Sequence, residues 1–123
     1  MADQGFPASS RILDSRDFDA VFKNNQYRVS THEFLLLARR NRLEHKRLGM
    51  VVSKRITSLA VNRNNLKRLI REVFRRTEII SLDIVILTRT GVNLLQNSEL
   101  IEILTRSISS LSNQSAANGN SVT

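Results

Sequence analysis

A row of basic side chains between residues 60 and 76 is the part of the sequence best suited to chemistry. The segment reads AVNRNNLKRLIREVFRR. At about 100° per residue, a helix would place Asn64 and five cations on one side: Arg63, Lys67, Arg68, Arg71 and Arg75. The opposite side would carry the apolar residues Leu66, Leu69, Ile70 and Val73, with Phe74 at its edge. Such a helix can bury one side and present positive charge to phosphate groups on the other.

The alternative is an ordinary solvent-exposed helix face, which is what most helical charge runs are. Such a face normally mixes charges, because opposite charges four residues apart stabilise a helix and like charges destabilise it. The basic side holds no acidic residue, and Glu72 lies beyond its border, where it can pair with Arg68 or Arg76. The pattern therefore favours an anionic ligand.

Two neighbouring features leave alternatives open. Lys54 and Arg55 either extend the basic surface or mark a strand end that meets solvent. Asn65 is either a binding residue or a simple residue of the first helical turn. Both questions depend on how the loop before the helix folds.

Other residues that could form a site give weaker signals. Phe18 and Phe22 are four residues apart, which on periodicity alone favours a place in the core, although aromatic rings beside a basic groove can stack on unpaired bases. His32 and His45 lie far apart, cysteine is absent and the acidic residues do not cluster. We therefore expect no metal site and no catalytic residue in this chain.

Composition supports one small domain with an anionic partner. The chain has 123 residues, with 19 Lys and Arg against 11 Asp and Glu and a net charge of +8. It contains neither a secretory signal pattern nor an apolar stretch long enough to cross a bilayer. We expect a cytoplasmic protein without a membrane partner.

The elements that must position these residues follow from periodicity and turn signals. We predict helices at about 15–23, 62–77 and 99–111, and strands at 27–30, 32–40, 47–54 and 83–88. The order is helix, three strands, helix, strand, helix, which predicts a single small α+β domain over residues 9–111. Residues 1–8 are expected to form a flexible arm and residues 112–123, rich in Ser, Asn and Ala, a disordered tail.

Residues 60–72 resemble the signature of the bacterial ribonuclease P protein component, A-V-x-R-N-R-x-K-R-x-x-R-E. Three further pieces match this family in the expected order: residues 11–13 with 17–23, residues 48–55 and residues 83–89. The resemblance runs from about residue 6 to residue 111.

The resemblance implies a function and a fold. Ribonuclease P removes the 5′ leader of precursor tRNA, and in bacteria its RNA subunit holds the catalytic metal ions, so Mg²⁺ is expected through that RNA and not through the protein. The partners would be ribonuclease P RNA and precursor tRNA, with no DNA. The fold would contain an unusual left-handed β-α-β crossover.

The resemblance also implies roles for particular residues. The RNA-contacting helix would use Arg63, Asn64, Lys67, Arg68 and Arg71, with Lys54 and Arg55 nearby, and Arg75 continues the same charged row. Phe18 and Phe22 would line a cleft for the single-stranded leader, which reverses the preference for the core. Two positions depart from the family pattern: Asn65 replaces a basic residue, and Leu37 stands where relatives often have an aromatic residue.

Other functions remain possible from the residues alone. A ribosomal or general RNA-binding module would share the charge but not the partner. A stand-alone nuclease is disfavoured by the scattered acidic residues, and a membrane-surface protein by the need to bury the apolar side of the basic helix.

Overall fold

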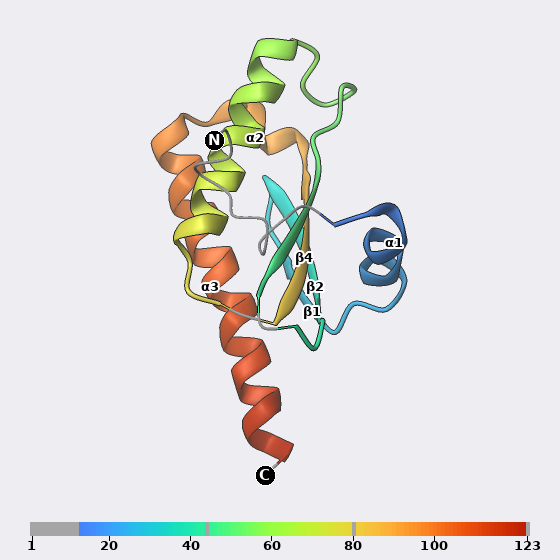
Figure 1. Ribbon diagram of the computed structural model, residues 1–123. Helices are drawn as coiled ribbons and strands as arrows, with labels where there is room; N and C mark the ends of the chain where they lie inside the picture. Colours follow the sequence, from blue (N-terminus) through green and yellow to red (C-terminus); the bar gives the residue numbers. More distant parts are fainter. Residues whose placement is uncertain (1–12, 44, 80, 123) are drawn as a thin grey trace, which may run out of the picture.

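The computed structural model describes residues 13–43, 45–79 and 81–122, with side chains of the last helix described to residue 116. Along these residues it forms helices, strands and one short 3₁₀ helix (Figure 1). In chain order these are α1 (Ser15–Lys23), β1 (Tyr27–Ser30), β2 (Phe34–Arg40), β3 (Arg47–Val51), α2 (Ala60–Arg76), β4 (Leu82–Thr88), η2 (Thr90–Leu94) and α3 (Asn97–Val122). The predicted α+β class is confirmed.

The four strands form one mixed sheet in the order β1-β2-β4-β3. β2 pairs with both β1 and β4 in antiparallel fashion, while β3 lies parallel to β4. The parallel pair is connected through α2, and this β3-α2-β4 crossover has the left hand that the resemblance implies (Figure 1). Helices α2 and α3 cover one face of the sheet and α1 lies on the other (Figure 1).

The strand sequences explain why both faces are covered. Side chains alternate between the faces of a strand, so an uninterrupted apolar run supplies two buried surfaces. In β2, Phe34 and Leu36 join the main core under α2 and α3, whereas Leu37 joins a smaller cluster on the α1 side. That smaller cluster also contains Leu13, Val21 and Val85.

Element ends differ from the predictions for local reasons. β2 begins at Phe34 and not at residue 32, because the Thr31 hydroxyl accepts a hydrogen bond from the Phe34 N–H at 2.9 Å and closes a turn. β3 ends at Val51, and a backbone bond from the Thr57 N–H to the Ser53 oxygen at 2.9 Å turns the chain toward α2. The 3₁₀ helix η2 was not predicted.

Helix α3 continues into the segment predicted to be a disordered tail, and this corrects the prediction for residues 112–116. Gln114 accepts a hydrogen bond from the Arg28 N–H at 3.3 Å and donates one to the Arg28 oxygen at 3.1 Å. Arg40 donates to the Ser115 oxygen at 2.7 Å. This part of the helix is therefore held by polar contacts to the sheet. The predicted arm, residues 1–8, lies outside the described residues.

Candidate nucleic-acid interface

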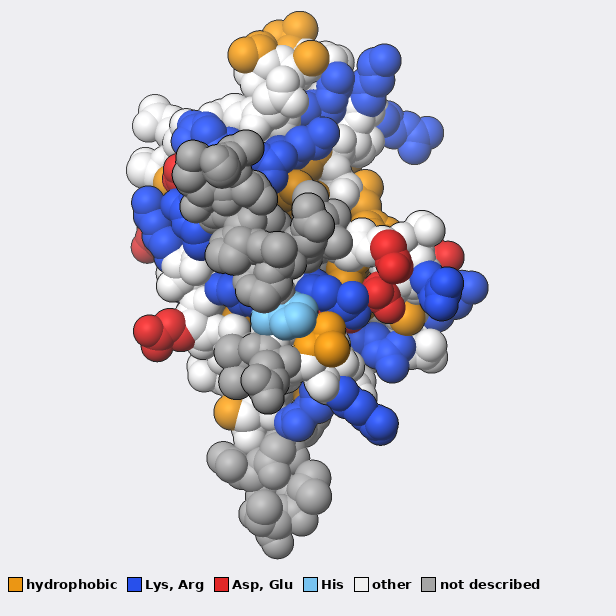
Figure 2. Space-filling view, in the orientation of Figure 1, with side chains coloured by type: hydrophobic (Ala, Val, Ile, Leu, Met, Phe, Trp, Pro, Cys, Tyr) orange, Lys and Arg blue, Asp and Glu red, His pale blue; other side chains and the backbone are white. Residues whose placement is uncertain are grey.

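The outer side of α2 carries the basic row that the sequence predicts. Its inner side is buried against the sheet and α3 through Leu66, Leu69, Ile70, Val73 and Phe74. On the outer side, Asn64, Arg68 and Arg75 are exposed and Lys67 and Arg71 are half-buried. In Figure 2, Lys and Arg side chains lie in the upper part of the molecule, where Figure 1 places α2 and the loop before it, and further ones lie at the right and lower right of the same face.

Glu72 is the carboxylate that pairs with cations on this side of α2. Glu72 lies 3.7 Å from Arg68 and 4.0 Å from Arg76, as the sequence predicts, and both are exposed pairs of the weak i,i+4 type. Within the described chain, no carboxylate lies within 4 Å of Lys67 or Arg71. These two cations keep their positive charge available for a ligand.

Arg63 differs from the other members of the row. It is half-buried, and its Nη1 donates to the Thr57 oxygen at 3.1 Å and to the Ser58 oxygen at 2.7 Å. These bonds tie the first turn of α2 to the preceding loop. The structure therefore gives Arg63 a positioning task in the protein itself, while its predicted RNA contact stays a prediction.

The opposite end of α2 is fixed by Lys46. Its Nζ donates to the backbone oxygens of Phe74 and Thr77 and lies 4.7 Å from the centre of the Phe74 ring. Burial lowers the pKa of Lys46 below its ordinary value. With Arg63 holding one end and Lys46 the other, α2 presents its cations in a fixed position.

Lys54 and Arg55 lie in the loop that connects β3 to α2, and both are exposed. Asn93 of η2 braces this loop: its Oδ1 accepts from the buried Thr57 hydroxyl at 2.8 Å, and its Nδ2 donates to the Ile56 oxygen at 2.6 Å. The two cations are thus loop residues beside α2 and not the end of a strand. Sequence reasoning missed Asn93, since nothing in its local pattern shows which loop it contacts.

Asn65 connects two helices and one cation of the row. Its Nδ2 donates to Oδ1 of Asn97 in α3 at 2.9 Å, and its Oδ1 accepts from Nη2 of Arg68 at 2.8 Å. Its role is therefore more than that of a first-turn residue. The amide in place of a basic residue orients Arg68.

The two phenylalanines of α1 take different positions. Their ring centres are 5.5 Å apart. Phe18 is half-buried and packs against the smaller apolar cluster, over Gly49, where an added Cβ would lie 2.8 Å from the Phe18 ring. Phe22 is 41% exposed. Leu37, the second departure from the family pattern, is buried in the same cluster and offers no surface for stacking.

The acidic residues nearest the sheet are engaged by Arg47. Its guanidinium lies 2.9 Å from Asp83 and 2.8 Å from Asp17, and the hydrogen bond with Asp83, more than any other contact, raises the pKa of Arg47. Asn41 donates a further bond to Asp83 at 2.8 Å. Asp17 and Asp83 thus hold α1 against the sheet. Across the described residues, no group of three or more His, Asp or Glu side chains could hold a metal ion, and no helix could span a membrane.

Comparison with known proteins agrees with this arrangement. Residues 6–112 match the family model described as Ribonuclease P. The ribonuclease P protein component of Pseudomonas aeruginosa is 45% identical over 102 residues, which cover 81% of this chain and 76% of that protein. The corresponding protein of Ectopseudomonas mendocina is 42% identical over 104 residues, covering 83% and 78%.

Solved structures are similar over most of the chain. The RNase P protein of Staphylococcus aureus superposes with a TM-score of 0.68 at 29% identity, covering 82% of this chain and 90% of that one. The RNase P protein of Thermotoga maritima gives a TM-score of 0.65 at 31% identity, covering 77% and 96%. Sequence, fold and basic surface agree: the chain belongs to the ribonuclease P protein family and is a protein subunit of the ribonucleoprotein that matures the 5′ ends of tRNAs.

Proposed function

We propose that the outer side of α2, together with the Lys54–Arg55 loop, binds the phosphates of ribonuclease P RNA, and that this RNA carries the catalytic chemistry. The observation that carries the proposal is the row of like charges on a helix fixed at both ends. Lys67, Arg71 and Arg75 follow one another at four-residue intervals, a rise of about 6 Å per step. Cations fixed in this way release counterions from RNA without first having to be ordered.

The acidic side chains support an accessory role for the protein. Asp17 and Asp83 are bound by Arg47, and Glu72 lies between Arg68 and Arg76. Each of these carboxylates is paired with an arginine of the protein itself, which leaves it a structural role and not a catalytic one. Divalent metal ions, expected to be Mg²⁺, would be bound by the RNA, and the fixed cations of α2 would reduce the concentration needed for assembly.

The second part of the proposal concerns precursor tRNA. Helix α1 carries the exposed Phe22 ring, and the sheet face that α1 covers carries the half-buried side chains of Leu35 and Leu87. An aromatic ring beside an apolar surface suits unpaired bases, which stack without sequence preference. We assign this face to the single-stranded 5′ leader, so that the protein favours precursor over mature tRNA.

The relatives reported above all carry the ribonuclease P name. The alternative of a ribosomal or general RNA-binding module therefore has no specific support. The membrane-surface alternative is disfavoured by the burial of the apolar side of α2 within the core.

Reconstitution tests the first part of the proposal. Ribonuclease P RNA is incubated with precursor tRNA at low Mg²⁺, with and without the protein, and 5′ leader removal is followed by gel electrophoresis. We expect the protein to stimulate cleavage by the RNA and to cleave nothing alone. Cleavage by the protein alone, or no stimulation, would contradict the assignment of catalysis and partner.

The leader assignment needs a separate variant. Phe22→Ala removes the ring, while Phe22→Leu keeps apolar volume without stacking. We expect Phe22→Ala to weaken binding of leader-bearing precursor and to leave mature tRNA binding unchanged, with Phe22→Leu between wild type and Ala. If both variants only lower the melting temperature, Phe22 stabilises the fold and the leader assignment is wrong.

A further inference from the structure

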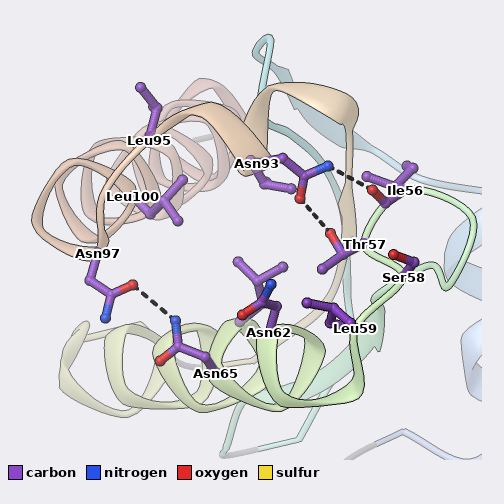
Figure 3. A pocket seen from close by; sticks show the side chains of 12 residues that line it. Ile56, Thr57, Ser58, Leu59, Asn62, Asn65, Asn93, Leu95, Asn97 and Leu100 are labelled. Atoms are coloured by element: carbon purple, nitrogen blue, oxygen red, sulfur yellow. Dashed lines mark hydrogen bonds between the residues drawn. The ribbon is translucent and has the colours of Figure 1, made fainter.

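A cavity of about 380 Å³ lies between the first turns of α2 and α3, on the side of the loop that precedes α2 (Figure 3). Its volume falls in the range of small-ligand sites. Side chains from two regions that are distant in sequence converge on it: the loop with the start of α2, and η2 with the start of α3.

The polar wall of the cavity is built from amides. Asn93 and Asn65 are held in place by their bonds to the loop and to Asn97. Asn62 points its amide into the space between them (Figure 3). Within the part of the chain that the structure describes, no hydrogen bond engages the Asn62 side chain. One donor group and one acceptor group are thus presented side by side.

The apolar wall is partly open. Leu66 and Leu100 are buried at 4% and 2% exposure and form the inner side. Leu59, which also lines the cavity, is 60% exposed. An exposed leucine beside a buried apolar floor offers contact to both faces of an inserted ring.

The electrostatic setting favours an anion. The first turn of α2 borders the cavity, and backbone N–H groups at a helix start lack helical partners and attract negative charge. Leu59, the N-cap of α2, provides no side-chain bond to them. The start of α3 is already capped, because the Glu99 carboxylate accepts a hydrogen bond from the Gln96 N–H at 2.9 Å. No Asp or Glu lines the cavity, and Arg68 reaches its rim through Asn65.

We infer that this cavity receives one unpaired nucleotide of ribonuclease P RNA, with its base between Leu59 and the buried leucines and its edge hydrogen-bonded to Asn62. The inference rests on the proposed function, because the cavity opens beside the basic row that is assigned to that RNA. An amide presents the paired donor and acceptor that a base edge requires, and unpaired bases are the usual targets of sequence-specific RNA recognition. This contact would add base recognition to a surface otherwise limited to phosphates.

The test compares Asn62→Ala with Lys67→Ala in binding to ribonuclease P RNA. Alanine is the better helix former and Asn62 is exposed, so the fold is kept. We expect Asn62→Ala to weaken binding about fivefold to fiftyfold with an unchanged salt dependence, because it removes a base contact and no charge. Lys67→Ala should instead flatten the salt dependence by about one unit. Asn113→Ala, on the exposed side of α3, is the matched control and should bind like wild type.

Chemical probing locates the nucleotide. The RNA is treated with dimethyl sulfate alone, with wild-type protein and with Asn62→Ala. We expect an unpaired adenine or cytosine to be protected by the wild type and to regain reactivity with the variant, while the rest of the footprint persists.

The outcomes separate the two proposals. If Asn62→Ala binds and protects like wild type while Lys67→Ala weakens binding, the cavity inference is wrong and the proposed function stands. If wild-type protein neither binds nor protects the RNA, both fail.

Discussion

Removing two cations from the middle of the α2 row should change the salt dependence of RNA binding more than it changes stability. Among the described residues, Lys67 and Arg71 have neither a carboxylate partner nor a side-chain hydrogen bond, whereas Arg63 is bonded to the preceding loop. The Lys67→Ala/Arg71→Ala variant lowers the net charge from +8 to +6. Because both side chains point outward from a packed helix, the core is left intact.

The magnitude follows from counterion release. Each phosphate contact contributes about 0.7 to 0.9 to the slope of log affinity against log salt. Losing two contacts should therefore flatten the slope by about 1.4 to 1.8. Between about 50 and 200 mM salt, the wild type should lose roughly tenfold more affinity than the variant.

Equilibrium binding to ribonuclease P RNA over a series of monovalent salt concentrations, at constant Mg²⁺, measures the slope. Arg71→Ala and Arg106→Ala form a matched pair, since each removes one guanidinium. Arg106 lies on the exposed side of α3, away from the α2 row. Arg71→Ala should flatten the slope by about 0.7 to 0.9, and Arg106→Ala should not change it. Equal slopes for this pair would refute the argument, because net charge and not the α2 row would then control binding.

Three further predictions concern stability and are measured by thermal or denaturant unfolding. Leu59→Ser should raise the free energy of unfolding by about 1 kcal/mol, because serine can make the side-chain hydrogen bond that the N-cap residue of α2 now lacks. No gain would mean that other groups already satisfy the N–H groups of the first turn. Gly49→Ala should lower it by about 1–3 kcal/mol, because the added Cβ would meet the Phe18 ring at 2.8 Å; an unchanged value would show that the ring moves freely. For Asp14, the hydrogen bond from the Asp17 N–H lowers the pKa of the carboxyl below 3.8, so its stabilisation is present above that pH and is lost as pH falls through the lowered pKa. Asp14→Asn keeps an acceptor but does not titrate, so wild type should lose more stability than this variant between about pH 5 and pH 2.

Local periodicity was sufficient for most elements. The positions of α1 and β1 and the inner and outer sides of α2 follow from residue spacing, and the structure confirms them. Strand order does not follow from spacing. That β3 lies parallel to β4 and not beside β2 depends on contacts between distant segments, and only the family resemblance anticipated the crossover.

The site shows the same limit at the level of side chains. Helical spacing placed Arg63 in the basic row, but spacing does not show that the preceding loop folds back and offers two carbonyl oxygens to it. Asn93 was missed for the same reason, since its two bonds reach a loop 36 and 37 residues away in sequence. The sequence held one signal of these contacts, Leu59 at the start of α2. A leucine side chain cannot cap a helix, so other groups must hold the first turn.

The end of α3 shows why composition misjudged residues 112–116. The prediction of a disordered tail counted the apolar surface that the segment could bury, which is small. Strand β1 lies at the edge of the sheet, so its outer N–H and C=O groups need partners other than a strand. Gln114 supplies both a donor and an acceptor to Arg28, as a neighbouring strand would. A polar residue can therefore extend a helix where it satisfies an exposed sheet edge, and composition alone does not contain that information.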